Sequence, residues 1–194
     1  MQFTSPYECA AWANVSQRIS MDQAARVQNA ILDAYGSPVL VDGVEVLAFP
    51  DPDRLARIRS VPGLAAPKLA RLHAVAAAAK DGTLDADRLR ALGDDAAPEL
   101  LRTIPGIGPF WSSGIYLRAC GIADAFPDEP LSIAALGALH GKGDRPADVR
   151  ALTDRYRPFR MWICFLLRVA AGQGVVAGVA GREGTIRRNA RLSA

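Results

Sequence analysis

The stretch Leu100-Leu101-Arg102-Thr103-Ile104-Pro105-Gly106-Ile107-Gly108-Pro109-Phe110-Trp111 decides how the chain is interpreted. A short helix is predicted to enter a Pro-Gly-Ile-Gly turn here, and a second helix follows, so that residues 98–120 form two helices joined by a hairpin turn. Glycine permits positive φ and lets another molecule approach the backbone closely. The free N–H groups and positive dipole end of the second helix favour an anion. The turn therefore predicts a phosphate held by backbone, and an ordinary sharp corner is the alternative.

The chain on either side of this turn is predicted to be helical. Ser20-Met21-Asp22-Gln23 has the form of a capping box, and Asp51-Pro52 has the form of an N-cap followed by a first helical residue. The only strand signal in the sequence is Val39–Val46, where two β-rich runs flank Asp42-Gly43 and predict a hairpin with a tight turn. The fold class is therefore all-α with one small β-hairpin. Further helices are expected over Leu84–Leu92, from Pro98, and over Pro130–His140, Pro146–Tyr156 and Pro158–Ala171.

Composition places the protein among globular chains. Its 194 residues carry 23 Lys and Arg against 20 Asp and Glu, and 50% are hydrophobic, which suffices for one domain or two small lobes sharing a core. Cys9, Cys120 and Cys164 are widely spaced among apolar residues, so buried thiols are predicted rather than a disulfide framework or a metal cluster. The most apolar stretch, Met161–Gly181, is interrupted by Arg168, so we expect a cytoplasmic protein without a membrane-spanning segment.

Charge is unevenly distributed along the chain. Residues 1–100 contain 10 basic and 13 acidic side chains, whereas residues 101–194 contain 13 basic and 7 acidic ones, and nearly all the basic residues are arginine. Arginine can bind phosphate through two parallel hydrogen bonds, so the basic half is compatible with nucleic-acid binding. A solvated surface explains the same excess. Residues 1–180 are expected to form the core, and the basic tail over 181–194 is expected to be loosely ordered.

Four short motifs occur in an order and spacing that indicate a family resemblance. They are Ala13-Asn14-Val15-Ser16-Gln17-Arg18-Ile19-Ser20, Ile104–Gly108, Asp124-Ala125-Phe126-Pro127 and Arg157-Pro158-Phe159-Arg160-Met161-Trp162. Together they resemble the helix-hairpin-helix (HhH-GPD) DNA glycosylases of the endonuclease III superfamily, and most of all the 3-methyladenine DNA glycosylase II branch. The resemblance covers approximately residues 5–170, nearly the whole chain.

The resemblance implies a two-lobed helical core with a cleft between the lobes, and an activity in base-excision repair. Such enzymes flip a damaged nucleotide out of duplex DNA and cleave the bond between base and sugar, where a carboxylate stabilises the developing oxocarbenium character. Bifunctional relatives carry a lysine just after the hairpin, where this chain has Phe110, so a monofunctional enzyme acting on alkylated purines is implied. The closely placed cysteines of iron–sulfur relatives do not occur in the sequence, so no such cluster is expected.

The expected catalytic carboxylate is the main departure from the family pattern. Counting from the hairpin without gaps places the family's aspartate on Pro130, which has no acid function, and Asp128 and Glu129 stand immediately before it. A one-residue shift of the loop would bring Glu129 into the pocket, so Glu129 is the first candidate and Asp128 the second. The alternative is that both acids only cap the following helix, which would leave a protein that binds DNA without catalysis.

The same resemblance implies roles for other residues. Arg18 stands where the family inserts a residue into the duplex after flipping, and a plain surface arginine is its alternative. The family's aromatic near the end of the last helix falls on Arg168, a second departure. The main-chain carbonyls of Arg102, Ile104 and Gly106 are implied to hold a monovalent cation, Na⁺ or K⁺, that bridges to phosphate. The residues implied to contact DNA are Arg18, Gly106, Ile107, Gly108, Phe110 and Trp111, and those implied to line the base pocket are Trp111, Tyr116, Phe159 and Trp162.

The implied partner is double-stranded DNA, bound by a monomer at the bacterial nucleoid, with no other cofactor and no membrane. Two other classes of function stay open from the residues alone: a non-catalytic module that binds damaged or unusual DNA, and a helical protein–protein adaptor in which the glycine turn is only a corner. Salt-dependent duplex binding separates the first two classes from the adaptor. Release of free base separates the enzyme from the binding module.

Overall fold

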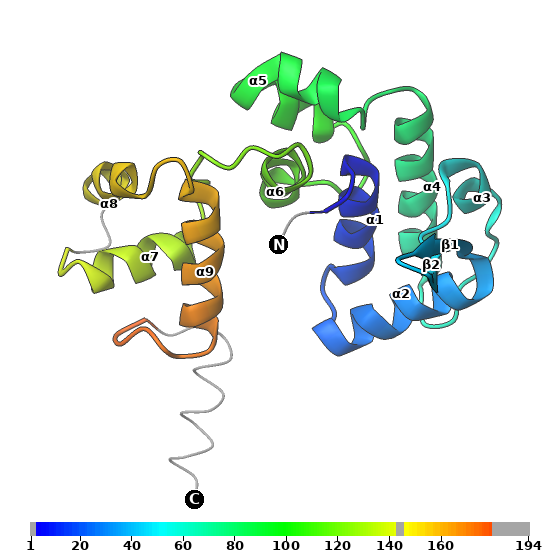
Figure 1. Ribbon diagram of the computed structural model, residues 1–194, viewed down its shortest axis with the longest axis horizontal. Coiled ribbons are helices and arrows are strands. Elements are labelled where there is room, and N and C mark those ends of the chain that lie inside the picture. The colour runs from blue at the N-terminus through cyan, green and yellow to red at the C-terminus, as the bar shows by residue number, and fades with distance from the viewer. Residues whose placement is uncertain (1–2, 143–145, 180–194) are drawn as a thin grey trace, which may run out of the picture. The chain divides into compact units, whose positions relative to one another are not determined.

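The computed structural model describes residues 3–142 and 146–179 (Figure 1). The chain divides into two compact units, an N-terminal one over Gln2–Gly121 and a C-terminal one from Ile122 onwards. In the described parts of the chain, every regular element is helical except for one two-stranded sheet. The predicted fold class, all-α with one small β-hairpin, is therefore confirmed. The predicted tail over 181–194 lies outside the described residues, and the cleft between two lobes stays a prediction.

The N-terminal unit is a group of helices built around α1. Helix α1 packs against α2, α4 and α6, and α5 packs against α6. Fully buried aliphatic side chains, among them Ile31, Leu72, Leu101 and Ile115, form its core. The elements of this unit are α1 (Pro6–Ser16), α2 (Met21–Tyr35), β1 (Ser37–Val41), β2 (Val44–Ala48), α3 (Pro52–Arg57), α4 (Ala66–Lys80), α5 (Ala86–Leu101) and α6 (Pro109–Ala119).

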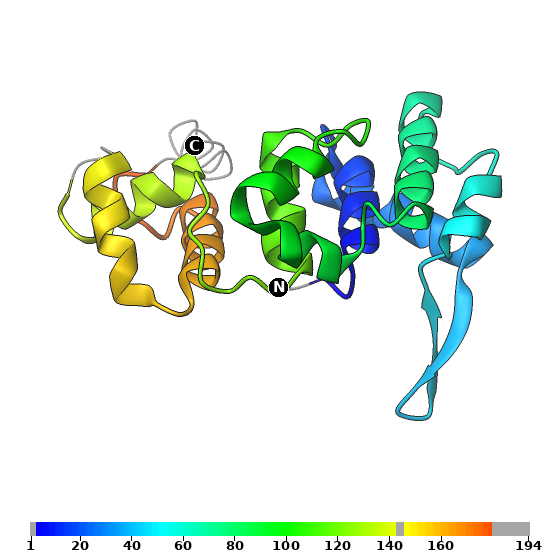
Figure 2. The same ribbon diagram turned by 90° about the horizontal axis from the view of Figure 1, so that it is seen from above.

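Local sequence signals account for most of these boundaries. The Ser20 side chain accepts from the Gln23 N–H while the Gln23 side chain accepts from the Ser20 N–H, so the predicted capping box starts α2. The Asp51 carboxylate caps α3, as predicted. Figure 2 shows the β1–β2 hairpin projecting from the helices of this unit. Asp42 and Gly43 both adopt positive φ (49° and 80°) at its turn, the conformation that a tight two-residue hairpin requires.

Helix α5 differs from the sequence prediction. A helix over Leu84–Leu92 and a separate one from Pro98 were expected, and within Ala86–Leu101 the structure has two helical segments that meet at a kink at Gly93. Gly93 adopts φ 79° and ψ −175°, a conformation that an L-residue rarely takes. The chain therefore changes direction at this one residue, and helical backbone lies on both sides of it. The prediction of two helices was therefore right about the break and wrong about the length of the gap.

The C-terminal unit consists of α7 (Pro130–Leu139), α8 (Pro146–Thr153), a 3₁₀ turn η1 (Asp154–Tyr156) and α9 (Arg160–Gly172). Helix α7 packs against both α8 and α9, and Leu136, Val149 and Ala171 are completely buried where the helices meet. The helix expected over Pro146–Tyr156 ends earlier and tightens into η1, and the helix expected from Pro158 begins two residues later. Within the described parts of the chain, no helix combines the length and apolar character needed to cross a membrane.

Candidate nucleic-acid interface and carboxylate site

The turn singled out from the sequence connects α5 to α6 in the N-terminal unit. The Ile107 N–H donates to the Ile104 carbonyl oxygen over 3.0 Å, which closes the turn. Ile104 and Ile107 are both buried, and they anchor the turn in the core. Gly106 adopts φ 89°, so glycine is required there for its backbone conformation. Gly108 is the N-cap of α6, and as a glycine it has no side chain that could accept from the first N–H groups of the helix. The positive end of the helix dipole is therefore not capped by this residue.

The inner side of the turn is closely packed against α1 and α4. A Cβ atom added to Gly106 would lie 2.4 Å from Asn14 Oδ1 and 2.7 Å from Arg71 Cδ, so no side chain larger than hydrogen fits. The Gln17 Nε2 group donates to the Gly106 carbonyl oxygen over 2.8 Å and ties the end of α1 to the turn. Asn14 Oδ1 is buried and has no hydrogen-bond partner among the described residues. The first motif of the sequence analysis therefore supports the turn directly.

An open hollow of about 410 Å³ lies beside the turn. Its walls include Gln17 and the residues of the turn itself, from Thr103 to Gly108. Three arginines, Arg18, Arg71 and Arg102, also line it, and none of its lining residues is acidic. The outer face of the turn is thus open and positively charged.

Glu129, the first candidate for the catalytic carboxylate, is the N-cap of α7 in the C-terminal unit. It is buried, with 8% of its surface exposed. The Ser132 N–H donates to Glu129 Oε2 over 2.7 Å, and the Ser132 Oγ atom lies 2.6 Å from the same oxygen and 2.8 Å from the Cys164 carbonyl oxygen. Arg168 Nη1 on α9 donates to Glu129 Oε1 over 2.6 Å. Both carboxylate oxygens therefore accept hydrogen bonds, and the side chain is fixed between α7 and α9.

Asp128, the second candidate, differs from Glu129 in its surroundings. It is exposed and precedes the N-cap of α7. Pro130 is the first residue of α7, a position that suits proline because its missing N–H would have no partner within the helix. Of the two acids, only Glu129 is buried.

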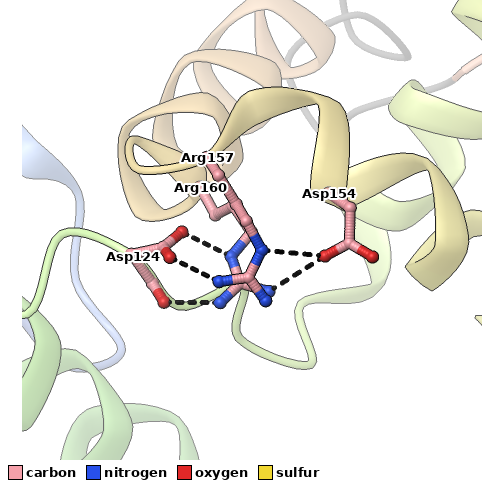
Figure 3. Close-up of polar contacts among 4 residues, drawn as sticks. All are labelled: Asp124, Asp154, Arg157 and Arg160. Carbon is pink, nitrogen blue, oxygen red and sulfur yellow. Dashed lines mark hydrogen bonds and ion pairs between the residues drawn. The ribbon is translucent and has the colours of Figure 1, made fainter.

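The two later family motifs are joined to each other by an ion-pair network (Figure 3). Asp124 accepts from Arg160 Nε over 2.6 Å and from Arg157 Nη1 over 2.7 Å, and the Asp124 carbonyl oxygen accepts from Arg160 Nη2 over 2.7 Å. Asp154 pairs with Arg157 and Arg160 from the other side. The Met161 N–H also donates to the Ala123 carbonyl oxygen over 2.9 Å. These contacts hold the start of the loop that carries Asp128 and Glu129 against the beginning of α9.

Replacing Asp124 with alanine tests this network. We expect Asp124→Ala to lower the free energy of unfolding by about 2 kcal/mol, because Arg160, whose side chain is only 18% exposed, loses its main carboxylate partner. Urea unfolding followed by circular dichroism measures the change. Asp154→Ala is the matched control: the Asp154 side chain is 65% exposed, and its loss should cost below about 1 kcal/mol. Equal losses in the two variants would contradict the assigned role of Asp124.

The chain is similar in sequence to a known DNA repair protein. No protein-family model matches the chain. In sequence, it is 34% identical over 166 residues to a Mycobacterium tuberculosis protein described as a probable bifunctional transcriptional activator/DNA repair enzyme AlkA. The match covers 80% of this chain and 31% of that protein, so the chain spans about a third of the length of this curated relative.

Two solved structures show the same architecture. DNA-3-methyladenine glycosidase from Bacillus halodurans matches with a TM-score of 0.66 at 20% identity, covering 92% of this chain and 81% of that one. The 8-oxoguanine glycosylase/lyase from Clostridium acetobutylicum, in complex with double-stranded DNA, matches with a TM-score of 0.64 at 18% identity, covering 88% and 61%. The chain has the fold of the helix-hairpin-helix DNA glycosylase superfamily. The resemblance drawn from the four motifs is confirmed.

In this glycosylase fold, the aromatic residues expected to line a base pocket fall in both units. Trp111 and Tyr116 lie on α6; Phe110 packs edge-on against Trp111, with ring centroids 5.5 Å apart. Tyr116 is buried, its hydroxyl donates to Asp94 Oδ1 over 3.0 Å, and burial together with this hydrogen bond raises the pKa of Tyr116 to about 12. Tyr116 is thus packed within the N-terminal unit, whereas Phe110 is 53% exposed. The pocket roles of Trp111 and Tyr116 stay predictions.

The other two pocket candidates belong to the C-terminal unit. Phe159 is the N-cap residue of α9 and is 58% exposed, and Trp162 lies in the first turn of that helix and is half-buried. More than half of the Phe159 side chain is therefore accessible to a ligand. The pocket roles of Phe159 and Trp162 stay predictions.

The implied cation can be compared with the carbonyl oxygens of the turn. The Ile104 carbonyl oxygen already accepts from the Ile107 N–H, and the Gly106 carbonyl oxygen accepts from Gln17. Each carbonyl oxygen keeps a second lone pair, so coordination is sterically permitted, but three arginines surround the same hollow. The Na⁺ or K⁺ site at Arg102, Ile104 and Gly106 stays a prediction.

The cysteines are buried, as the sequence predicts. Cys9, Cys120 and Cys164 are free thiols, and burial raises the pKa of Cys120 and Cys164 to about 11 and that of Cys9 to about 12. Across the described residues, no group of three or more His, Cys, Asp and Glu side chains is placed to hold a metal ion. Neutral buried thiols are poor nucleophiles, so the cysteines are structural.

Sequence reasoning missed some residues of these sites. Ser132 carries no capping-box signal, because that pattern has Ser or Thr at the N-cap and Glu or Gln three positions later, and Glu129 and Ser132 stand in the reverse order. Arg168 was noted only as a departure from the family, and no local signal pairs it with a residue 39 positions away. Arg71 carries no motif signal, since its importance depends on α4 lying beside the turn.

Proposed function

We propose that the chain is a monofunctional DNA glycosylase that removes alkylated purines from duplex DNA by base flipping and hydrolysis of the N-glycosidic bond. The observation that carries the proposal is the buried carboxylate of Glu129, held at the N-terminus of α7 by Arg168 and Ser132. The named relatives, a DNA repair enzyme AlkA and a 3-methyladenine glycosidase, support the substrate class. The proposed enzyme acts as a monomer in the bacterial cytoplasm, at the nucleoid.

The chemistry needs a fixed negative charge beside the sugar. As the bond between base and sugar lengthens, positive charge develops on the sugar, and a carboxylate that is already oriented stabilises it without further reorganisation. Glu129 meets this requirement because its hydrogen bonds fix its position before substrate arrives. An alkylated purine carries positive charge and leaves readily, so the mechanism needs no strong acid. The base would be held by stacking on aromatic side chains, for which Phe110, Trp111, Phe159 and Trp162 are the candidates.

In the proposed enzyme, the turn between α5 and α6 binds the backbone of the DNA. Its outer face is open, its glycines let a strand approach the backbone, and it leads into a helix N-terminus that attracts phosphate. Contacts of this kind are made to the sugar–phosphate backbone and are independent of base sequence. A repair enzyme that must search all sequences requires this type of binding.

The lysines support a monofunctional mechanism. The chain contains three lysines, and a Schiff base to the sugar would need a free amine near it. Lys68 Nζ donates to the carbonyl oxygens of Val15 and Gln17, each over 2.7 Å, and caps the end of α1. Lys80 pairs with Asp53 over 2.6 Å. Two of the three amines are therefore engaged in structural contacts, and Phe110 occupies the position where bifunctional relatives carry lysine.

Base release from alkylated duplex DNA tests the proposal. We expect the protein to release free 3-methyladenine or 7-methylguanine, detected by chromatography, and to leave abasic strands that break only after alkali treatment. A duplex containing 8-oxoguanine is the matched control, since the fold is shared with an 8-oxoguanine glycosylase/lyase. Release of 8-oxoguanine alone would contradict the proposed substrate class, and strand breakage without alkali would contradict the monofunctional mechanism.

One observation favours a second candidate function, a module that binds damaged DNA without catalysis. Glu129 Oε2 accepts from the Ser132 N–H at the start of α7, which is the arrangement expected of a structural N-cap. Under this alternative, alkylated or abasic duplex is bound in a salt-dependent manner and no free base appears. The base-release assay therefore separates the two functions.

A further inference from the structure

The arginines of the hollow beside the turn differ in their partners. Arg102 pairs with Glu99 over 2.6 Å. Across residues 3–142 and 146–179, neither Arg18 nor Arg71 has an ion-pair partner. Arg71 is half-buried, and the residues lining the hollow include no acid that could neutralise it. A partly buried guanidinium group without a partner loses hydration without gaining a compensating contact. We therefore expect an anion to bind it and to replace the lost hydration.

Two further observations show that Arg71 and Arg18 lie beside the turn. The Arg71 side chain lies against Gly106, where an added Cβ atom would approach its Cδ to 2.7 Å and its Nε to 3.3 Å. Arg18 lines the same hollow, and its backbone adopts φ 59°, a left-handed conformation that L-residues rarely take. Burial and, second, the charge of Arg71 lower the pKa of Lys68, so the Arg71 guanidinium group lies close enough to act on that ammonium group.

The same geometry disfavours a small cation at this place. Two of the three carbonyl oxygens implied to coordinate it already accept hydrogen bonds, from Ile107 and from Gln17. A cation on these oxygens would lie in a hollow that three guanidinium groups line, and like charges at short range repel. A phosphate in the hollow has the opposite sign and matches the planar fork of arginine.

We propose that Arg71 and Arg18 hold a backbone phosphate of duplex DNA at the turn, and that their guanidinium groups supply the positive charge in place of a bound monovalent cation. This inference rests on the proposed function, since it takes DNA as the ligand, and it names two side chains that bind it. The turn amides orient the phosphate, and the arginines neutralise it.

Duplex binding as a function of salt concentration tests the inference, with fluorescence anisotropy of an unmodified labelled duplex as the probe. Arg71→Gln should weaken binding about tenfold and reduce the slope of log affinity against log salt by about 1, because one phosphate contact is lost. Arg59→Gln is the matched control: Arg59 is exposed, lies outside the hollow, and loses the same charge. We expect its affinity to stay within about twofold of the parent protein.

A second variant and a salt exchange complete the experiment. Arg18→Gln changes an exposed side chain that the fold does not need, so it should reproduce the altered slope even where Arg71→Gln weakens the fold. Replacing K⁺ by tetramethylammonium at equal concentration should leave the affinity of the parent protein within about twofold, because counterion release is the same. A tenfold loss in tetramethylammonium would show a coordinated cation and overturn the inference.

The remaining outcomes separate the inference from the proposed function. If the parent protein binds duplex and releases free base from alkylated DNA, while both arginine variants bind equally well with unchanged slopes, the inference is overturned and the proposed function stands. If the variants change the slope but no base is released from alkylated DNA, the inference stands and the glycosylase function is overturned. If the parent protein binds no duplex, both are overturned.

Discussion

Glu129→Gln is expected to slow base release from alkylated duplex by a factor of about 10²–10⁴, the range seen when a positioned catalytic carboxyl group is removed. Glutamine has the same shape and keeps an oxygen that can accept from the Ser132 N–H, so the cap of α7 survives. It lacks the negative charge that stabilises the developing positive charge on the sugar. Single-turnover release of labelled free base measures the rate, and duplex affinity should not change, because Glu129 belongs to the C-terminal unit and does not line the hollow at the turn.

Asp128→Asn is the matched control for this variant. Asp128 precedes Glu129 in the same loop and loses the same charge, but it is exposed. We expect its base-release rate to stay close to that of the parent protein. If Asp128→Asn abolishes release while Glu129→Gln does not, the carboxylate has been assigned to the wrong residue. If neither variant slows release, no carboxylate of this loop takes part in the reaction.

Arg168 makes the Glu129 site different from a simple helix cap. The ion pair with Arg168 brings a guanidinium Nη1 atom to 2.6 Å from the Glu129 carboxylate oxygen Oε1. A capping residue needs no such partner, since the helix N–H groups alone hold it. The Arg168 side chain is 45% exposed, so its charge is partly screened by solvent. The pair therefore orients Glu129 more than it neutralises it.

Elements that depend on neighbouring residues could be predicted from the sequence. The capping box at Ser20 and Gln23, the tight turn at Asp42-Gly43 and the glycine turn at Gly106 each need only a few adjacent residues, and all are present as expected. Their physical causes, a satisfied N–H group or a positive φ, act within one turn of the chain. The same holds for Pro130 at the first position of α7.

Contacts between distant residues could not be predicted in the same way. Arg168 meets Glu129 because α9 packs on α7, and Arg160 meets Asp124 because the chain returns from η1. Neither pairing follows from spacing along the chain, since many arrangements of amphipathic helices bury the same faces. The kink at Gly93 shows that prediction from neighbouring residues is limited even within one element. Glycine predicts a break in the helix, but it does not predict that a helical segment follows directly and that α5 packs against α6.

Gly106→Ala is expected to lower the free energy of unfolding by about 3 kcal/mol, because it combines two costs. Alanine at φ 89° is strained, and its methyl group would meet the buried Asn14 Oδ1 at 2.4 Å, so that α1 or the turn must move. Displacement of the turn would also weaken its binding of phosphate, and so lower the affinity for duplex DNA. Urea unfolding measures the first effect and duplex anisotropy the second.

Gly108→Ala separates stability from binding. Gly108 has φ −94°, and an added Cβ atom meets nothing within 4 Å, so alanine fits without strain. Alanine is a weaker N-cap than glycine, and the expected loss of stability is below about 1 kcal/mol. Its methyl group would nevertheless stand on the outer face of the turn, where it blocks close approach of a DNA strand. Affinity for duplex DNA should therefore fall by the same factor whatever the base sequence. If Gly108→Ala left affinity unchanged in a stable protein, the open side of the turn would not be where the phosphate binds.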